Sequence, residues 1–159
     1  MNDVILLTGG NLGDRSFNLT TARERLIAAL GPLQAASSLY STAPWGVTDQ
    51  PDFLNQVLII TTALPPDAVL RTILSIEESL GRVRTTKWAP RPIDIDILFY
   101  GSLVIDTPSL VVPHPEIPNR RFVLAPLTEV APDLVHPVLG LKIRELLSQT
   151  PDTAAVTRL

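Results

Sequence analysis

The chain has 159 residues, enough for one sizeable core, so we expect residues 1–159 to form a single domain. The net charge of −3 argues against a protein that binds nucleic acid over its whole surface, and the absence of cysteine excludes disulfides and zinc–thiolate sites. The early apolar run at residues 4–7 is too short to cross a bilayer, and no basic leader precedes it. We therefore expect a cytoplasmic protein with no membrane partner.

The spacing of apolar residues predicts strands and helices in alternation along the chain. In chain order, the predicted elements are a strand at residues 4–7, a helix with its apolar stripe at 19–30, a strand closing at 38–41, a strand at 53–63, a helix at 65–80 and a strand at 93–100. This order is that of a ferredoxin-like βαββαβ sandwich. The predicted fold is therefore α+β, with a mainly antiparallel sheet and helices packed on it.

The rest of the chain is expected to form a C-terminal extension of this sandwich. Residues 103–105 could pair with the strand at 93–100 as a hairpin, whereas residues 108–118 are too rich in proline for the centre of a sheet. Two short helices are predicted near residues 124–130 and 141–147. A fold of this kind hosts many activities, so the function has to come from particular residues.

Asp94 and Asp96 stand in the pattern Ile-Asp-Ile-Asp-Ile within the last predicted strand. Because side chains alternate along a strand, both carboxylates should face one side, with Cα atoms roughly 6.5–7 Å apart. Such a pair can hold two magnesium ions about 4 Å apart, a geometry that clamps a transferring phosphoryl group. The alternative is a half-exposed strand with its acids in water. Aspartate is a poor strand former, and close like charges repel unless a cation lies between them, so the metal site is favoured.

A run of cations without intervening acids, consisting of Arg82, Arg84, Lys87 and Arg91, precedes this strand and flanks Trp88. Guanidinium groups suit phosphate oxygens, and an indole can stack on a flat ring. A positive patch beside two carboxylates fits phosphates plus a metal better than a nucleic acid backbone. The alternative is a solvated basic loop with Trp88 in the core. Together these residues predict magnesium-dependent transfer of a phosphoryl-type group from ATP to a flat heterocyclic alcohol.

Three weaker signals have ordinary structural explanations. The glycines at residues 9–13 lack the ending of a phosphate-binding P-loop, and a tight turn from strand to helix explains them better. Glu77 lies beside the apolar face of the second predicted helix, where it could be a solvated carboxylate. His114 lies between two prolines, and a structural role and a nucleotide contact are both compatible with that position.

Several motifs occur in order along residues 4–137 and are specific when taken together. They are Gly-Asn-Leu-Gly-Asp-Arg at 10–15, Tyr-Ser-Thr-Ala-Pro-Trp-Gly at 40–46, Gln-Pro-Asp-Phe-Leu-Asn at 50–55, Gly-Arg-Val-Arg at 81–84, Trp-Ala-Pro-Arg-Pro-Ile-Asp-Ile-Asp-Ile-Leu at 88–98, Val-Pro-His-Pro at 112–115 and Asn-Arg-Arg-Phe at 119–122. With these motifs the sequence resembles the 6-hydroxymethyl-7,8-dihydropterin pyrophosphokinase family of folate synthesis.

The resemblance implies transfer of pyrophosphate from ATP to the hydroxymethyl group of a reduced pterin, with release of AMP. It also implies that Asp94 and Asp96 hold two magnesium ions and that Arg82 and Arg91 assist the transfer. The implied pterin-binding residues are Thr42, Pro44, Phe53, Asn55, Trp88 and Phe122. The implied ATP-binding residues are Glu77, Arg82, Arg84, Arg91, Ile97, His114 and Arg120. The residues that depart from the family's frequent choices are Gly10, Lys87, Ala89, Ser109 and Val111.

Two other functions remain open on the sequence alone. One is a non-catalytic ligand-binding module with a ferredoxin-like fold, and the other is a magnesium-dependent nucleotidyltransferase or nuclease. Because pyrophosphoryl transfer must exclude water, we expect the loops at residues 42–52 and 82–92 to close over the substrates. We also expect a monomer, because no predicted apolar stripe lacks a partner in the core.

Overall fold

The computed structural model describes residues 1–44, 49–82 and 91–159 of the chain. Within these residues one antiparallel sheet has the strand order β5-β1-β4-β3-β8, with β2 also beside β4. Its strands are β1 (Asn2–Gly10), β2 (Leu33–Ala36), β3 (Tyr40–Thr42), β4 (Phe53–Thr62), β5 (Asp94–Tyr100) and β8 (Val156–Arg158). The helices are α1 (Arg15–Leu30), α2 (Pro66–Ser79), α3 (Arg121–Val130) and α4 (Ile143–Gln149), with a 3₁₀ turn η1 (Ile117–Asn119). The short strands β6 (Ile105–Asp106) and β7 (Val111–Val112) pair with each other.

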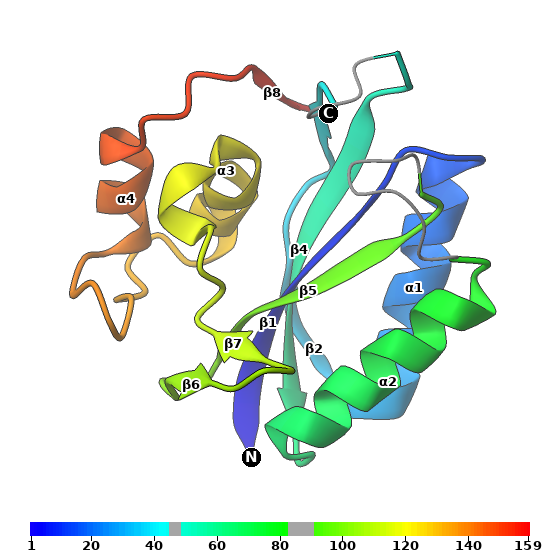
Figure 1. The fold of residues 1–159 in the computed structure, drawn as a ribbon, viewed down its shortest axis with the longest axis horizontal. Helices are drawn as coiled ribbons and strands as arrows, with labels where there is room; N and C mark the ends of the chain where they lie inside the picture. Colours follow the sequence, from blue (N-terminus) through cyan, green and yellow to red (C-terminus); the bar gives the residue numbers. More distant parts are fainter. Residues whose placement is uncertain (45–48, 83–90) are drawn as a thin grey trace.

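The sheet lies between two layers of helices, with α1 and α2 on one face and α3 and α4 on the other (Figure 1). The apolar run of β1 serves both faces, because alternate side chains point to opposite sides of a strand. Val4 and Leu6 pack into the core under α1 and α2, whereas Ile5 and Leu7 pack into the core under α3 and α4. An unbroken apolar run is what a strand covered on both faces requires.

The first helix is delimited by signals that the sequence carries. The carboxylate of Asp14 accepts a hydrogen bond from the N–H of Phe17 at 3.1 Å, which caps the start of α1. The helix ends before Gly31, where the backbone has φ 144° and passes close to β4. A Cβ atom at Gly31 would lie 2.1 Å from the carbonyl oxygen of Thr61, so only glycine fits this approach.

The predicted α+β fold of ferredoxin-like order is confirmed. The two short C-terminal helices are confirmed as α3 and α4, but the extension also contains β8, a strand that the sequence patterns did not predict. The predicted hairpin between residues 103–105 and 93–100 is wrong, because the pairing partner of β6 is β7. A turn opened by Thr107 reverses the chain first, since its N–H donates to the carbonyl of Leu110 at 3.0 Å. Pro108 stands at the second position of this turn, where proline is favoured.

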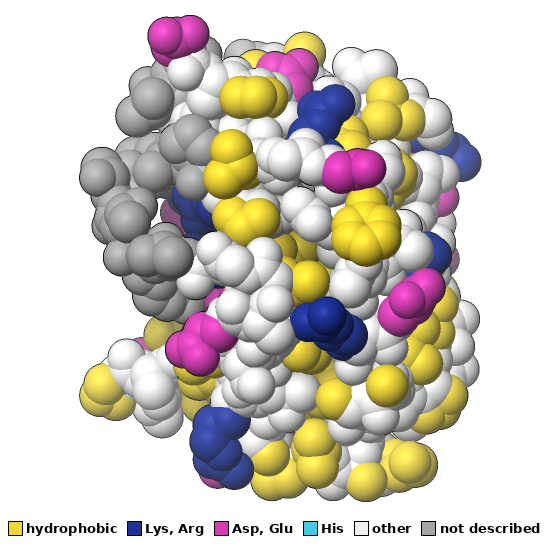
Figure 2. All heavy atoms as spheres, turned by 90° about the vertical axis from the view of Figure 1, so that its right-hand side faces the viewer, with side chains coloured by type: hydrophobic (Ala, Val, Ile, Leu, Met, Phe, Trp, Pro, Cys, Tyr) yellow, Lys and Arg dark blue, Asp and Glu magenta, His cyan; other side chains and the backbone are white. Residues whose placement is uncertain are grey.

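On the face shown in Figure 2, acidic, basic and apolar side chains are interspersed over the described part of the surface. No helix in the described ranges is long and apolar enough to cross a membrane.

Candidate active site

A pocket opens between the end of β3, the start of β4 and β5, and the first turn of α3. Its free space, with the open mouth included, is about 640 Å³. The described residues that line it are Leu7, Gly9, Thr42, Ala43, Phe53, Asn55, Arg91, Asp94, Asp96, Arg120 and Phe122. Eight of these eleven were site candidates from the sequence, and those eight come from β3, β4, the start of β5 and the start of α3.

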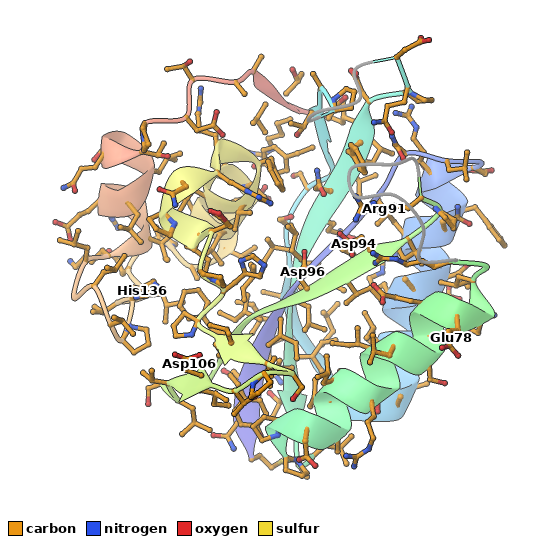
Figure 3. All side chains as sticks on the ribbon, viewed as in Figure 1. Glu78, Arg91, Asp94, Asp96, Asp106 and His136 are labelled. Carbon is orange, nitrogen blue, oxygen red and sulfur yellow. The ribbon has the colours of Figure 1, made fainter. Side chains whose placement is uncertain are left out.

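The two acids of β5 lie on the same face of the sheet, as the alternation predicted. Both Asp94 and Asp96 line the pocket, whereas Ile95 and Ile97 are buried in the core beneath α1 and α2. Figure 3 shows Arg91, Asp94 and Asp96 in succession along this end of β5. The predicted arrangement of the carboxylate pair is therefore confirmed.

Gly9 of the neighbouring strand β1 leaves room for the side chain of Asn55. Gly9 stands opposite Asp94 in the pairing of β1 with β5, and it stands opposite Asn55 in the pairing with β4. A Cβ atom at Gly9 would lie 2.3 Å from the side-chain oxygen of Asn55. Any larger residue at this position would displace Asn55, so the glycine keeps the floor of the pocket in place.

Both carboxylate oxygens of Asp94 accept hydrogen bonds from guanidinium groups. Arg82 donates to Oδ1, and Arg91 donates to Oδ2 at 3.3 Å. These side chains are largely shielded from solvent, with exposures of 12% for Arg82 and 21% for Arg91. Two cations are thus held against one acid at the edge of the pocket, where phosphate oxygens could replace that acid as their partners.

Glu77 organises this corner from behind, on the last turns of α2. The carboxylate accepts hydrogen bonds from Arg82 and from the backbone N–H of Ile95, both at 2.8 Å. Glu77 is only 3% exposed, so the alternative of a solvated carboxylate is wrong. Ile95 lies between the two acids, so Glu77 fixes the backbone that presents them as well as the orientation of Arg82.

The environment of Asp96 disfavours its charged form. Burial raises the pKa of Asp96 well above its usual range, and the negative charges of Asp94 and Glu77 act in the same direction. The guanidinium groups of Arg82 and Arg91 oppose this shift without cancelling it. A carboxylate that lacks compensating positive charge in this way is suited to receive a cation.

Asn11 is an organising residue whose role the sequence patterns did not reveal. Its side chain donates to Gln50 Oε1 at 2.7 Å and to the carbonyl of Pro51 at 3.0 Å, and its Oδ1 accepts from the N–H of Arg91 at 3.0 Å. It is 1% exposed. Asn11 therefore ties the segment at Gln50 and the segment at Arg91 to the end of β1. In the sequence, the signal for this role was the position of Asn11 directly after two glycines.

The neighbouring departure at Gly10 has a steric explanation. A Cβ atom there would lie 2.4 Å from the carbonyl oxygen of Pro92, which is a backbone atom. Serine, the residue that the family often has, would require the segment around Pro92 to shift. Glycine at this position thus allows β1 and the segment before β5 to pack more closely.

Aromatic rings and polar groups form the other walls of the pocket. The guanidinium carbon of Arg91 lies 5.8 Å from the ring centre of Phe53, and that of Arg120 lies 5.7 Å from the ring centre of Phe122. Among the described residues, the buried hydroxyl of Thr42 has no hydrogen-bond partner. An unpaired buried hydroxyl is costly, so a ligand that hydrogen-bonds to it would be stabilised here.

Some predicted site residues lie away from the pocket lining. The side chain of Ile97 is in the core on the opposite face, Pro44 is half-buried beyond the lining residues, and Glu77 and Arg82 lie behind Asp94. His114 makes local contacts, since its Nδ1 accepts from the N–H of Glu116 at 3.1 Å. Its nucleotide contact stays a prediction. Arg84, Trp88, Lys87 and Ala89 lie outside the described residues, as do parts of the two loops expected to close.

Comparisons of the sequence with known proteins identify the family of this chain. The sequence model described as 7,8-dihydro-6-hydroxymethylpterin-pyrophosphokinase matches residues 5–132. A 2-amino-4-hydroxy-6-hydroxymethyldihydropteridine pyrophosphokinase of Methylorubrum extorquens is 44% identical over 160 residues, covering 100% of this chain and 99% of that protein. An enzyme of the same name from Synechocystis is 40% identical, covering 92% of this chain and 75% of that protein.

Solved structures agree on the fold. The crystal structure of Plasmodium falciparum HPPK-DHPS with pteroate superimposes with a TM-score of 0.77 at 18% identity, over 93% of this chain and 42% of that one. This likeness concerns the fold, whereas the matches at 40–44% identity identify the enzyme. The chain belongs to the 7,8-dihydro-6-hydroxymethylpterin-pyrophosphokinase family, whose enzymes transfer pyrophosphate from ATP to the pterin in folate biosynthesis.

Proposed function

We propose that Asp94 and Asp96 hold two magnesium ions, that Arg82, Arg91 and Arg120 receive the phosphates of ATP, and that the pocket beside them binds the pterin. The observation that carries the proposal is the joint position of both acids on one pocket face, next to two guanidinium groups that already lie against Asp94. This arrangement suits pyrophosphoryl transfer, in which positioning and neutralisation of charge supply most of the catalysis.

The chemistry of the two carboxylates fits magnesium. Within the described residues no three acidic or histidine side chains gather as a complete set of metal ligands. Magnesium does not need such a set, because it commonly binds one or two carboxylates and completes its shell with water and substrate phosphate oxygens. The raised pKa of Asp96 supports the assignment, since an added positive charge would favour the ionised carboxylate. When bound, the ions neutralise charge on the phosphates and help to align them.

The arginines are placed to exchange partners when substrates arrive. In the described structure both oxygens of Asp94 are engaged by guanidinium groups. If Asp94 turns to a cation, Arg82 and Arg91 become available to phosphate oxygens close to where they already lie. Glu77 keeps its bond to Arg82 at 2.8 Å and so limits how far this side chain can swing. The roles of Arg84 and Trp88 in binding ATP and the pterin are proposals that rest on the family resemblance.

The apolar and polar walls of the pocket fit a flat, nitrogen-rich ring. Phe53 and Phe122 offer aromatic faces. Asn55 and the hydroxyl of Thr42, which has no hydrogen-bond partner among the described residues, offer hydrogen bonds at the edge of such a ring. The hydroxymethyl oxygen of the pterin would attack the β-phosphorus in line, and AMP would leave. No side chain has to act as a nucleophile in this scheme.

Identification of the nucleotide product tests the proposal. The chain is incubated with ATP, magnesium and 6-hydroxymethyl-7,8-dihydropterin, and the products are separated by chromatography. We expect AMP and the pterin diphosphate in equal amounts, and both should disappear in Asp94→Asn and Asp96→Asn. Asp106→Asn, which changes an exposed acid on β6, serves as the matched control. Undiminished AMP formation in the two β5 variants would contradict the metal assignment.

Three finer features stay predictions from the sequence: two ions, a monomer, and a cytoplasmic location. Isothermal titration with magnesium in the presence of a non-hydrolysable ATP analogue counts the ions, and analytical ultracentrifugation gives the oligomeric state.

A further inference from the structure

The segment at residues 150–159, called the strap below, runs from α4 past α3 to the edge of the main sheet (Figure 1). It lies beyond residues 5–132, the stretch that the family model matches. Two walls of the pocket lie along its course. One wall is the end of β3 with Thr42, and the other is the first turn of α3 with Phe122.

The strap holds the first turn of α3 through Asp152. The carboxylate Oδ2 accepts from the N–H of Arg121 at 2.8 Å, and Oδ1 accepts from the N–H of Ala154 at 2.9 Å. Arg121 is the first residue of α3, and Arg120 before it provides no side-chain cap. Asp152 therefore supplies the capping acceptor at a helix start, where negative charge is also favoured by the helix dipole.

The strap holds β3 by strand pairing. Val156 stands opposite Thr42 and Thr157 opposite Ser41, and the N–H of Leu159 donates to the carbonyl of Leu39 at 2.9 Å. β3 contains only three residues, and each of them is paired with β8 as well as with β4, so β8 doubles the strand pairing of β3. The strap thus fixes the strand that ends at the pocket.

A polar cluster joins the two walls beside the strap. Glu129 of α3 accepts from the hydroxyl of Tyr40 at 2.7 Å and from the N–H of Ser38 at 3.0 Å. Arg158 of the strap lies between the same groups, with its Nε donating to Ser38 Oγ at 3.1 Å and its Nη2 3.7 Å from Glu129. Burial, with help from Glu129, raises the pKa of Tyr40 to about 12, so its hydroxyl keeps the proton that it donates.

The cluster and the pocket lie in register on the same two elements. Tyr40 and Thr42 are two residues apart, so both point to one face of β3. Phe122 and Glu129 are seven residues apart, so they lie two turns apart on nearly the same side of α3. The hydrogen bond between Tyr40 and Glu129 therefore sets the spacing between β3 and α3. It does so close to Thr42 and Phe122, the residues of the same two elements that bound the pocket.

We infer that the strap is a positioning element for the pterin: through Asp152 and the pairing of Thr157 it sets the separation between Thr42 and Phe122. The inference rests on the proposed function, because it takes these two residues to hold the pterin. Asp152 and Thr157 are absent from the described lining of the pocket, so they act through the walls and do not touch the ligand.

Variants of the full-length chain test this inference through a difference between kinetic constants. Asp152→Ala removes the capping acceptor. In an antiparallel pair every second residue directs its N–H to the partner strand. The N–H of Leu159 donates to the residue before β3, so the N–H of Thr157, two residues earlier, also faces β3, and Thr157→Pro removes it. For both variants we expect the KM for the pterin to rise about fivefold or more, while kcat and the KM for ATP stay within about twofold.

Conservative changes at the same positions are the matched controls. Asp152→Asn keeps one acceptor oxygen, which can serve the N–H of Arg121, and Thr157→Val keeps the backbone N–H. Both variants should therefore have the KM of the wild type for the pterin. Tyr100→Phe is a control for a general loss of stability. Tyr100 lies at the end of β5 away from the pocket, and the change removes the hydroxyl that donates to the carbonyl of Leu64. It should leave the KM for the pterin unchanged.

Each outcome decides the inference. An unchanged KM for the pterin in Asp152→Ala, even with a lower melting temperature, would mean that the strap only stabilises the fold. A similar rise in the KM for the pterin in Tyr100→Phe would also mean that the strap acts only through the stability of the fold. If circular dichroism shows that Thr157→Pro does not fold, Asp152→Ala decides alone. A wild-type chain that forms no AMP would overturn the proposed function itself, whereas an active wild type with unaffected variants overturns only the inference.

Discussion

The two faces of β5 differ although their residues alternate along seven positions of one strand. On one face Ile95 and Ile97 are buried beneath α1 and α2, and on the other Asp94 and Asp96 line a pocket. The strand geometry is the same for the isoleucines and the aspartates. What covers each face therefore decides whether its side chains are buried in the core or line the pocket. Helices with apolar stripes exclude water from the isoleucines, whereas guanidinium groups and an open pocket surround the acids. The comparison separates residues that stabilise the fold from residues that we propose to perform the chemistry.

Removal of an acid should have the largest effect on activity. We expect Asp96→Ala to lower kcat by about 10³-fold or more, because the metal and the developing charge lose a partner. The melting temperature should stay the same or rise, because the variant removes a carboxylate whose charged form is disfavoured by burial. Steady-state AMP formation and thermal unfolding measure the two quantities. Activity within tenfold of the wild type would show that the acidic face is not catalytic.

One position further along, Ile97→Ala should show the opposite pattern. Ile97 is 5% exposed, and truncation of a buried isoleucine lowers the free energy of unfolding by about 3 kcal/mol. The kcat of the folded fraction should stay within about twofold of the wild type. Urea denaturation and activity at low denaturant test both statements. A selective rise in the KM for ATP would instead support the nucleotide contact implied for this residue.

A smaller effect on activity is expected at Arg91, where a lysine variant separates the role of the planar guanidinium group from that of its charge. Arg91→Lys keeps the positive charge near Asp94 but loses the planar fork and the contact with the ring of Phe53. We expect kcat/KM for ATP to fall about tenfold. The matched control is Arg71→Lys, which changes an exposed arginine paired with Asp67 on α2. Equal activity in the two variants would mean that charge alone suffices at Arg91.

The smallest effect concerns the far end of β5, where Phe99 contacts the edge of His136 with ring centres 5.7 Å apart. Burial lowers the pKa of His136, and its Nδ1 accepts from the N–H groups of Val138 and Leu139. Because the folded state prefers the neutral ring, its contribution to stability is complete above the ordinary histidine pKa of about 6.5. That contribution is lost as the pH falls from there through the lower pKa of the folded state.

His136→Asn isolates this contribution, because its side-chain oxygen can accept the same hydrogen bonds without titrating near neutral pH. We expect the difference in unfolding free energy between wild type and variant to shift against the wild type as the pH falls from 7.5 to 5. The slope is at most about 1.4 kcal/mol per pH unit for one group. Chemical denaturation at several pH values measures it, and a difference independent of pH would refute the assignment.

The sequence by itself determined the parts of this protein that depend on local periodicity. Alternation along residues 93–97 was enough to place Asp94 and Asp96 on one face, and the apolar stripes of α1 and α2 were enough to predict helices packed on the sheet. The order of strands and helices then limited the fold to one architecture. Most of the pocket lining was also named in advance, because the motifs that resemble those of the pyrophosphokinase family contain these residues.

Only the tertiary structure decided which distant groups meet. Glu77 looked like a surface acid until α2 brought it under β5, and Asn11 looked like a turn residue until two remote segments closed around it. β8 has three residues, too few for a periodic signal, and it exists because β3 offers it a free edge. Periodicity reports which side of an element is buried, but it carries no information on the partner. Partners are set by packing between elements that are far apart in the chain.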